Sequence, residues 1–219
     1  ARAAFVLEAA SPDFPDGTIH LAVVDPGVGT ARRALAVRAR EHFFVGPDNG
    51  VLEWALRDPA AEARALTEER FFRHPVSRTF HGRDVFAPVA AHLACGTALA
   101  DLGPAVRDPV RLPDAVPRVR DGLLEGCIML VDRFGNALTN LCAEDLARAF
   151  PGVAESQLEV TVSRHRIAGL TRSYGDRPVG AFVAIMGSSG RLEIAQVGGH
   201  CGSRLGIGER DPVTVRRAD

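Results

Sequence analysis

The chain has 219 residues, of which 46% are apolar and 24% are charged, and its formal net charge at pH 7 is −1. A disordered chain would have fewer apolar residues and a larger net charge, so this composition predicts a globular protein with a sizeable core. The balanced charge gives no global field that would attract nucleic acid or an anionic membrane. All 26 basic residues are arginine, which excludes a Walker A lysine and a Schiff-base lysine within this chain.

The four cysteines, Cys95, Cys127, Cys142 and Cys201, lie far apart, and no Cys-x-x-Cys pair occurs. This spacing indicates neither a zinc site nor a disulfide framework, and the apolar neighbours of the cysteines predict buried free thiols. No apolar stretch approaches the roughly 20 residues that span a bilayer, and no signal peptide is visible. We therefore expect a cytoplasmic protein that does not bind membranes.

The first hundred residues alternate between helical and strand-like patterns. Helical composition or spacing covers 1–10, 51–57, 59–66 and 88–100, and short β-rich runs cover 18–24, 34–38 and 42–45. Alternation of this kind predicts an α/β layer that extends to about residue 105.

The character of the chain changes after residue 104. Four prolines within 104–122 favour an extended linker, and beyond it strand-like runs are separated by glycine and proline turns. The expected strands cover 127–132, 158–167, 181–186, 191–197 and 212–217, and a short helix is expected at 143–149. The sequence thus predicts two domains, 1–118 and 119–219, of which the second is a small β-barrel or sandwich.

The first cluster of residues that could support chemistry is Asp25-Pro-Gly-Val-Gly-Thr30. It ends the expected strand 18–24, and Arg32 and Arg33 follow it directly. In open α/β sheets ligands bind beyond the carboxyl ends of strands, and glycines let backbone N–H groups approach them. A tight turn with a capping aspartate explains the same residues.

The second cluster, Thr79–Asp84, precedes the expected helix 88–100. Its His81 could act as a general base or orient a carboxylate, because histidine exchanges protons near neutral pH. The alternative is a plain helix start, in which Asp84 caps the first turn and His81 is merely exposed.

The third cluster runs from Asp132 to Asn140, and the fourth is Gly187-Ser188-Ser189-Gly190. In the third, Phe134 offers a flat aromatic ring and Asn136 offers a donor and an acceptor, which is what recognition of a purine requires. The fourth could form a polar nest for a carboxylate or a phosphate. A hairpin turn and a glycine-serine turn account for the same two clusters equally well.

Together and in this order, the clusters resemble a known family. Five blocks carry the likeness: FPDGTIHLAVVDPGVGTARR (14–33), FVGPDNGVL (44–52), TFHGRDVFAPVAAHLA (79–94), DRFGNALTN (132–140) and GSSGRLEIA (187–195). They look like blocks of the S-adenosyl-L-methionine hydroxide adenosyltransferases, which are related to the fluorinase and chlorinase that use the same substrate. The likeness is weakest over 105–122.

The resemblance implies an α/β protein with an N-terminal α/β sandwich-like domain and a smaller C-terminal β-barrel domain. It also implies a homotrimer whose sites lie where the N-terminal domain of one subunit meets the C-terminal domain of its neighbour. The implied reaction is hydrolysis of S-adenosyl-L-methionine to adenosine and L-methionine, by attack of water or hydroxide on the ribose C5′. We expect no metal or organic cofactor, because a sulfonium leaves without electrophilic help and no Cys/His cluster has ligand spacing.

The resemblance also assigns roles to individual residues. It places a catalytic triad on Asp25, Arg32 and His81, where Arg32 fits the family's seven-residue spacing better than Arg33 does. The implied substrate-binding residues are Phe134, Asn136 and Tyr174 for the adenine, Asp132 and Ser188 for the methionine portion, and Glu193 as a further purine contact.

Two departures from the family pattern leave alternatives open. The first is at the N-terminus, where nothing before Ala1 supplies the family's usual Thr-Asp-Phe-Gly-like stretch, so an N-terminal segment is expected to be missing. The second is near the C-terminus, where QVGGHCGSRLG (196–206) replaces the family's usual Asn-x-Gly-Asn-Ala-Ala-like run. One alternative is a halide-using relative that makes 5′-halo-5′-deoxyadenosine, although a carboxylate such as Asp25 beside the nucleophile disfavours a halide. The other is a catalytically silent trimer that binds S-adenosylmethionine or adenosine.

Overall fold

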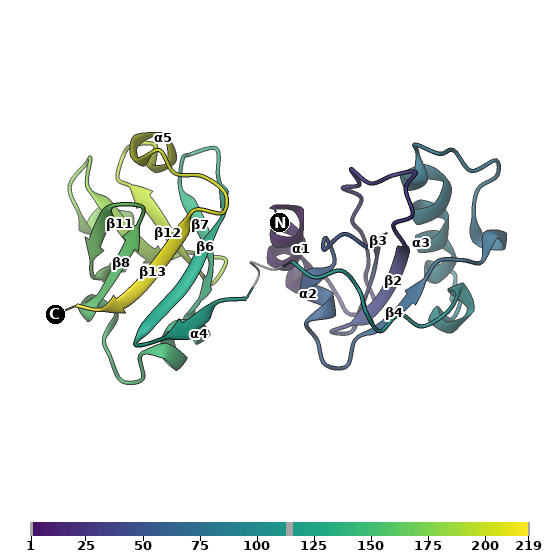
Figure 1. The fold of residues 1–219 in the computed structure, drawn as a ribbon, viewed down its shortest axis with the longest axis horizontal. Coiled ribbons are helices and arrows are strands. Elements are labelled where there is room, and N and C mark those ends of the chain that lie inside the picture. Colours follow the sequence, from purple (N-terminus) through teal and green to yellow (C-terminus); the bar gives the residue numbers. More distant parts are fainter. Residues whose placement is uncertain (1, 113–115, 219) are drawn as a thin grey trace. The chain divides into compact units, whose positions relative to one another are not determined.

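The computed structural model of the chain describes residues 2–112 and 116–218. It divides into two compact units, Ala1–Leu112 and Pro113–Asp219 (Figure 1). Residues 113–115, in the middle of the expected linker, lie outside the described residues.

The first unit is a mixed sheet with helices on both faces, which confirms the predicted α/β class (Figure 1). Its helices are α1 (Arg2–Ala10), α2 (Glu53–Leu56) and α3 (Ala87–Ala94), and its strands are β1 (Ile19–Leu21), β2 (Ala34–Ala39), β3 (His42–Pro47) and β4 (Glu62–Ala65). Leu35, Val37 and Phe44 pack with α1 and α2 on one face, whereas Ala36 and Val45 pack with α3 on the other. This alternation is the period-two pattern of a sheet buried on both faces.

The order of the strands, β1-β3-β2-β4, brings three chain segments to one edge of this sheet. Strand β1 runs parallel to β3, so the carboxyl ends of both strands meet there. Strand β2 runs antiparallel to β3, with Ala34 opposite Pro47, so β2 begins at the same edge. The segments that follow β1 and β3 and the segment that precedes β2 therefore lie side by side.

The helix predicted over 59–66 is wrong, because this segment contains the edge strand β4. Residues 62–65 have the helix-forming sequence EARA, yet they pair antiparallel with β2, with Ala65 opposite Leu35. The side chains of Ala63 and Ala65 are buried and alternate with the more exposed Glu62 and Arg64. Sheet pairing thus overrides a weak local helix propensity.

Both ends of the expected linker form backbone hydrogen bonds with the unit next to them in the chain. Pro104 accepts a hydrogen bond from Ala65 N–H at 2.9 Å, and Val106 donates one to Ala63 at 2.9 Å, so this stretch extends the β4 edge. At the other end β5 (Arg118–Arg120) pairs antiparallel with β6 of the second unit. The division of the chain accordingly falls between residues 112 and 113.

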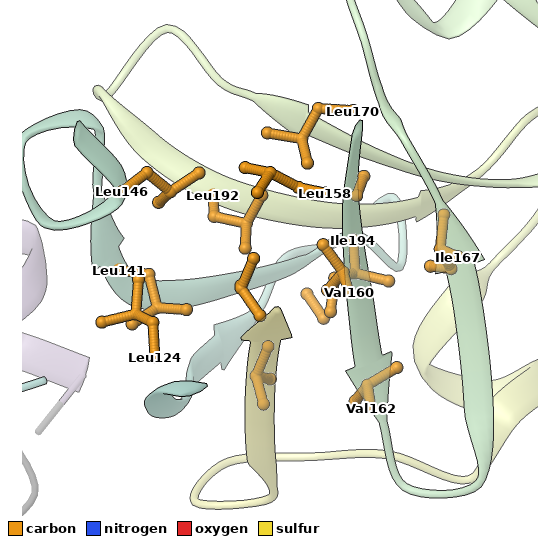
Figure 2. Packing of buried hydrophobic residues seen from close by; sticks show 14 of the residues in the cluster. Leu124, Leu141, Leu146, Leu158, Val160, Val162, Ile167, Leu170, Leu192 and Ile194 are labelled. Atoms are coloured by element: carbon orange, nitrogen blue, oxygen red, sulfur yellow. The ribbon is translucent and has the colours of Figure 1, made fainter. Parts of the chain in front are cut away.

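The second unit is a curled β-sheet around one apolar core. Its strands are β5 (Arg118–Arg120), β6 (Leu123–Val131), β7 (Ala137–Cys142), β8 (Leu158–Val162), β9 (His165–Ala168), β10 (Leu170–Thr171), β11 (Phe182–Met186), β12 (Arg191–Gln196) and β13 (Pro212–Arg217), and its helices are α4 (Ala143–Ala149) and α5 (Cys201–Leu205). The strand order is β10-β11-β12-β7-β6-β13-β8-β9, and the two end strands are consecutive in the chain. The sheet therefore forms a nearly closed barrel, and Figure 2 shows side chains such as Leu124, Leu158, Val160 and Ile194 meeting in its interior.

The cysteines differ in burial. Cys127 and Cys201 are buried as predicted and Cys142 is half-buried. Cys95 is exposed at the end of α3, so the prediction of burial is wrong for Cys95. No helix within the described residues is long and apolar enough to cross a membrane.

A pair of histidines lies in the first unit beside Phe44. The rings of His20 and His42 are 5.0 Å apart, and His20 stacks on Phe44 at 4.9 Å. Within the described residues, His20 Nε2 and His42 Nδ1 are buried without a hydrogen-bond partner. Burial, and secondarily the neighbouring His42, lowers the pKa of His20 below 6.5.

This lowered pKa predicts that acid destabilises the first unit. Below about pH 6.5 the unfolded chain binds a proton that the folded chain resists, so the free energy of unfolding decreases as the pH falls through this range. The variant His20→Phe keeps a ring against Phe44 but cannot titrate, and its melting temperature should depend less on pH. Thermal unfolding of both proteins between about pH 8 and pH 5 measures the difference, and identical slopes would contradict the prediction.

Candidate active site

The structure brings Asp25, Arg32 and His81 together at the sheet edge of the first unit. Arg32 binds the Asp25 carboxylate with two donors: Nε donates to Oδ1 at 2.9 Å, and Nη2 donates to Oδ2. The same Nη2 lies 2.9 Å from His81 Nδ1. The side chains of Arg32 and Asp25 are only 10% and 6% exposed, so the ion pair is shielded from water.

The geometry fixes which His81 nitrogen carries the proton. A guanidinium can only donate, so His81 Nδ1 must accept the hydrogen bond from Arg32. The imidazole is then neutral, with its proton on Nε2. In this arrangement His81 presents an N–H donor on the side of the ring away from Arg32.

Packing around Arg32 supports this arrangement. Its guanidinium lies over the ring of Phe86, 5.1 Å from the centroid. Phe86 is fully buried and belongs to the π-helical turn η3 (Gly82–Phe86), which directly follows His81 and leads into α3. Wide helical turns of this kind are frequent at functional sites.

Asp84 lies buried within that turn, so the interpretation of Asp84 as a helix cap is wrong. Its carboxylate accepts hydrogen bonds from Arg83 Nε at 2.7 Å, from Arg73 at 3.2 Å and from the backbone N–H of Ser77 at 2.9 Å. These donors, Arg83 first, hold the pKa of Asp84 well below its usual range. Asp84 thereby ties the preceding loop to the turn that carries His81.

Arg33 points elsewhere and does not join the triad. Its guanidinium binds Asp48 through Nε at 2.8 Å and Asp108 through Nη1 at 2.7 Å. The arginine that completes the cluster in the structure is therefore Arg32.

In the second unit, Asp132 organises the turn between β6 and β7. Its Oδ1 accepts the backbone N–H groups of Phe134 at 2.8 Å and Asn136 at 2.9 Å, and Asn136 Nδ2 donates to Oδ2 at 3.3 Å. The hairpin interpretation is thus correct for the backbone. The Phe134 side chain is nevertheless 63% exposed, so the turn presents an aromatic ring next to an amide.

Tyr174 and Glu193 form a second polar pair in this unit. Tyr174 O–H donates to Glu193 Oε1, and Glu193 is buried on β12, opposite Leu138 of β7. Burial raises the pKa of Glu193, and the nearby Asp132 adds to the effect. Burial, with the hydrogen bond to Glu193, raises the pKa of Tyr174 to about 12. Asp132, Tyr174 and Glu193 thus share one electrostatic environment.

Ser188 lies exposed in the hairpin between β11 and β12. Gly187 beside it packs closely on Glu193, because a Cβ at Gly187 would lie 2.9 Å from Glu193 Oε2. Because Gly187 contacts Glu193, the adjacent Ser188 lies close to the Tyr174–Glu193 pair. The nine predicted site residues form two groups, three in the first unit and six in the second.

Sequence reasoning missed His200 of the unusual segment 196–206. His200 Nδ1 accepts the Ser203 N–H at 3.1 Å and so caps α5. A Cβ on Gly135 would lie 2.3 Å from the His200 ring, and Gly202 N–H donates to the Gly135 carbonyl at 2.9 Å. Helix α5 therefore packs against the Phe134–Asn136 turn at Gly135, where φ is 90° and a side chain would collide with His200.

No group of three or more His, Cys, Asp or Glu side chains that could hold a metal occurs in the described part of the chain.

Comparison with known proteins gives matches over both units. The S-adenosyl-L-methionine hydroxide adenosyltransferase N-terminal domain matches residues 1–103, and the C-terminal domain of the same family matches residues 126–214. The (R)-S-adenosyl-L-methionine hydrolase of Thermus thermophilus is 43% identical over an alignment that covers 98% of this chain and 82% of that protein. A fluorinase from Actinoplanes sp. is 28% identical over 62% of this chain and 55% of its own length.

A solved structure shares the same fold. The uncharacterized conserved protein from Thermotoga maritima superposes with a TM-score of 0.87 and 36% sequence identity, covering 99% of this chain and 83% of that one. The two domains of one adenosyltransferase family thus match in order, the N-terminal domain over the α/β unit and the C-terminal domain over the barrel. The chain belongs to the S-adenosyl-L-methionine hydroxide adenosyltransferase family.

Proposed function

We propose that this chain is an enzyme that hydrolyses S-adenosyl-L-methionine to adenosine and L-methionine. The observation that carries the proposal is the cluster of Asp25, Arg32 and His81, in a chain 43% identical to a named (R)-S-adenosyl-L-methionine hydrolase. That name specifies the R form of the sulfonium compound, so we propose the R epimer as the substrate.

In the proposed mechanism the triad positions a water molecule in line with the bond between C5′ and sulfur. Each Asp25 oxygen accepts one Arg32 donor and retains a lone pair that can accept a hydrogen bond from water. His81 Nε2–H donates to the oxygen of the same water. A water held by one acceptor and one donor keeps a lone pair free for attack.

The displacement forms the C5′–O bond while the C5′–S bond breaks, and its electron pair goes to sulfur. Methionine leaves as a neutral thioether, so no acid is required to protonate the leaving group. The proton that the attacking water loses is taken up through Asp25 and passes to solvent. No metal or organic cofactor takes part in this scheme.

The second unit supplies the binding contacts of the proposal. Phe134 and Tyr174 stack on the adenine, Asn136 binds its edge together with Glu193, and Asp132 and Ser188 bind the methionine portion. The acidic residues among them suit a substrate that carries a sulfonium and an ammonium cation.

The proposal is tested by identifying products after incubation with each sulfonium epimer, with and without fluoride or chloride. Hydrolysis predicts adenosine and methionine from the R epimer at a rate that halide does not change. A halogenated deoxyadenosine would favour the halide-using alternative, and binding without any product would favour the silent binder.

The exposed ring of Phe134 leads to a prediction about affinity. Stacking of a base on an aromatic side chain is worth about 1–3 kcal/mol, so Phe134→Ala should weaken adenosine binding by about 5- to 150-fold. Tyr174→Phe keeps its ring and should change affinity by less than about threefold. Isothermal titration with adenosine measures both variants, and equal affinities for Phe134→Ala and the parent protein would contradict the stacking role.

We also propose a homotrimer, in which each site combines residues from two subunits, and a cytoplasmic location. The support is the family resemblance and the separation of the two residue groups along the chain. Light scattering should give three times the chain mass at micromolar concentration, and a stable monomer would count against the trimer.

A further inference from the structure

The turn that follows β3 contacts the backbone on both sides of the Asp25–Arg32 pair. Asn49 Nδ2 donates to the carbonyl of Val24, the residue before Asp25, at 2.9 Å. Asp48 N–H donates to the carbonyl of Arg33, the residue after Arg32, at 3.0 Å. Two adjacent residues thus hold the two segments that carry the triad carboxylate and guanidinium.

The topology explains why this turn reaches both segments. Leu21 of β1 pairs with Val45 of β3 in parallel register, and Ala34 of β2 pairs with Pro47 on the other side. Strand β3 is therefore the central neighbour of β1 and β2. The chain that leaves β3 emerges between the chain that leaves β1 and the chain that enters β2.

Asp48 is held firmly in place. It is 5% exposed, its Oδ2 accepts Arg33 Nε at 2.8 Å, and its Oδ1 accepts the backbone N–H of Val110 at 2.8 Å. The carbonyl of Arg33 that Asp48 binds also accepts a hydrogen bond from Arg32 Nη1 at 3.3 Å. Asp48 is thus one hydrogen-bonded step from the triad guanidinium.

The rest of the turn is equally constrained. Asn49 Oδ1 accepts the Val51 N–H at 3.2 Å, so both ends of its amide are engaged. Gly50 has φ of 89°, and a Cβ there would lie 2.5 Å from Leu112. These contacts hold the turn in place, and the turn thereby holds the backbone to which it is hydrogen-bonded.

We propose that Asn49 and Asp48 are positioning residues for the triad, because they set the separation between the backbone before Asp25 and the backbone after Arg32. Neither residue has to touch the substrate in this role. This inference can be tested in two ways. A test by kcat rests on the proposed hydrolysis, whereas a test by the NMR signals of the triad side chains does not.

The kinetic test uses Asn49→Asp and Asn49→Ala. Aspartate has the shape of asparagine but cannot donate to the Val24 carbonyl, so it separates the hydrogen bond from the filling of space. A small displacement of catalytic groups can reduce the rate by about 10²-fold. We expect both variants to lower kcat by about 10- to 100-fold and to leave KM within about threefold.

Glu62→Gln is the matched control, because Glu62 lies on edge strand β4 in an exposed ion pair with Arg38. It should keep the parental kcat and KM. If Asn49→Ala does not fold, Asn49→Asp carries the test, since it preserves the volume of the side chain.

The spectroscopic test follows the ¹⁵N and ¹H signals of the His81 ring and the Arg32 Nε–H in the protein without substrate. Asn49→Asp should move both signals, and Glu62→Gln should move neither. Moved signals in a protein that does not hydrolyse the substrate would support positioning and refute the proposed function. Unmoved signals together with kcat within about twofold of the parent would overturn the positioning role.

Discussion

Replacing Asp25 by alanine is expected to lower kcat by about 10²- to 10⁴-fold, which is the typical loss when a general base or positioning group is removed. Affinity for S-adenosyl-L-methionine should stay within about threefold of the parent, because in the proposed mechanism the lost contact is to the water and acts mainly in the transition state. Steady-state kinetics with a separate measurement of substrate binding checks both values. His81→Ala should give a smaller loss of the same kind, because the proposed mechanism has His81 hold the water from a second direction.

The stability of the Asp25 variants must be measured alongside their kinetics. Asp25 forms a shielded ion pair with Arg32, so its removal leaves a guanidinium without its carboxylate and should lower the melting temperature. Asp25→Asn keeps the shape and an acceptor, and it should fold better while remaining slow. If Asp25 were only a turn cap, its loss would cost about 1 kcal/mol of stability with kcat unchanged. Full turnover with a lowered melting temperature would therefore refute the catalytic role.

Replacing Arg32 by lysine should reduce kcat by about 10²-fold or more. The guanidinium of Arg32 spans both Asp25 oxygens and His81 Nδ1 at once, and a single ammonium cannot reproduce that planar set of donors. The lysine variant would keep the positive charge, so a loss of this size assigns the effect to geometry. Rapid-mixing or steady-state assays of the folded variant measure it.

Arg33→Lys is the matched control for the Arg32 variant. Arg33 is adjacent in sequence and equally charged, but it binds Asp48 and Asp108 rather than the triad. Its lysine variant should lose less than about tenfold in kcat, through loosening of the Asp48 network alone. A larger loss in Arg33→Lys than in Arg32→Lys would reverse the assignment of the two arginines.

The elements of the fold were predictable where the hydrophobic pattern was strong. The short helix at 143–149 lies where the sequence predicts it, as α4 (Ala143–Ala149), and the strand-like runs 181–186, 191–197 and 212–217 contain β11, β12 and β13. The single strand predicted over 158–167 is wrong, because this run folds back on itself as the antiparallel pair β8 and β9. The segment 59–66 could not be assigned in this way, because its alanines suit a helix and only pairing with β2 makes part of it a strand.

The candidate site was only partly predictable from single motifs. Each cluster also fits a plain turn. The structure shows that Asp132 organises a hairpin turn in which the Phe134 ring is exposed, and purine recognition by that ring stays a prediction. The choice between Arg32 and Arg33 depends on side-chain direction, which adjacent positions in a sequence do not specify. The contacts of Asn49 and His200 join residues far apart in the chain, so they follow from sheet topology and packing rather than from local sequence.

The most direct test of the proposed hydrolysis is the reaction in H₂¹⁸O with (R)-S-adenosyl-L-methionine, followed by mass spectrometry of both products. Attack of water on C5′ predicts adenosine with one ¹⁸O atom in its 5′-hydroxyl group and methionine without label. Unlabelled adenosine, or a nucleoside other than adenosine, would contradict displacement at C5′ by water.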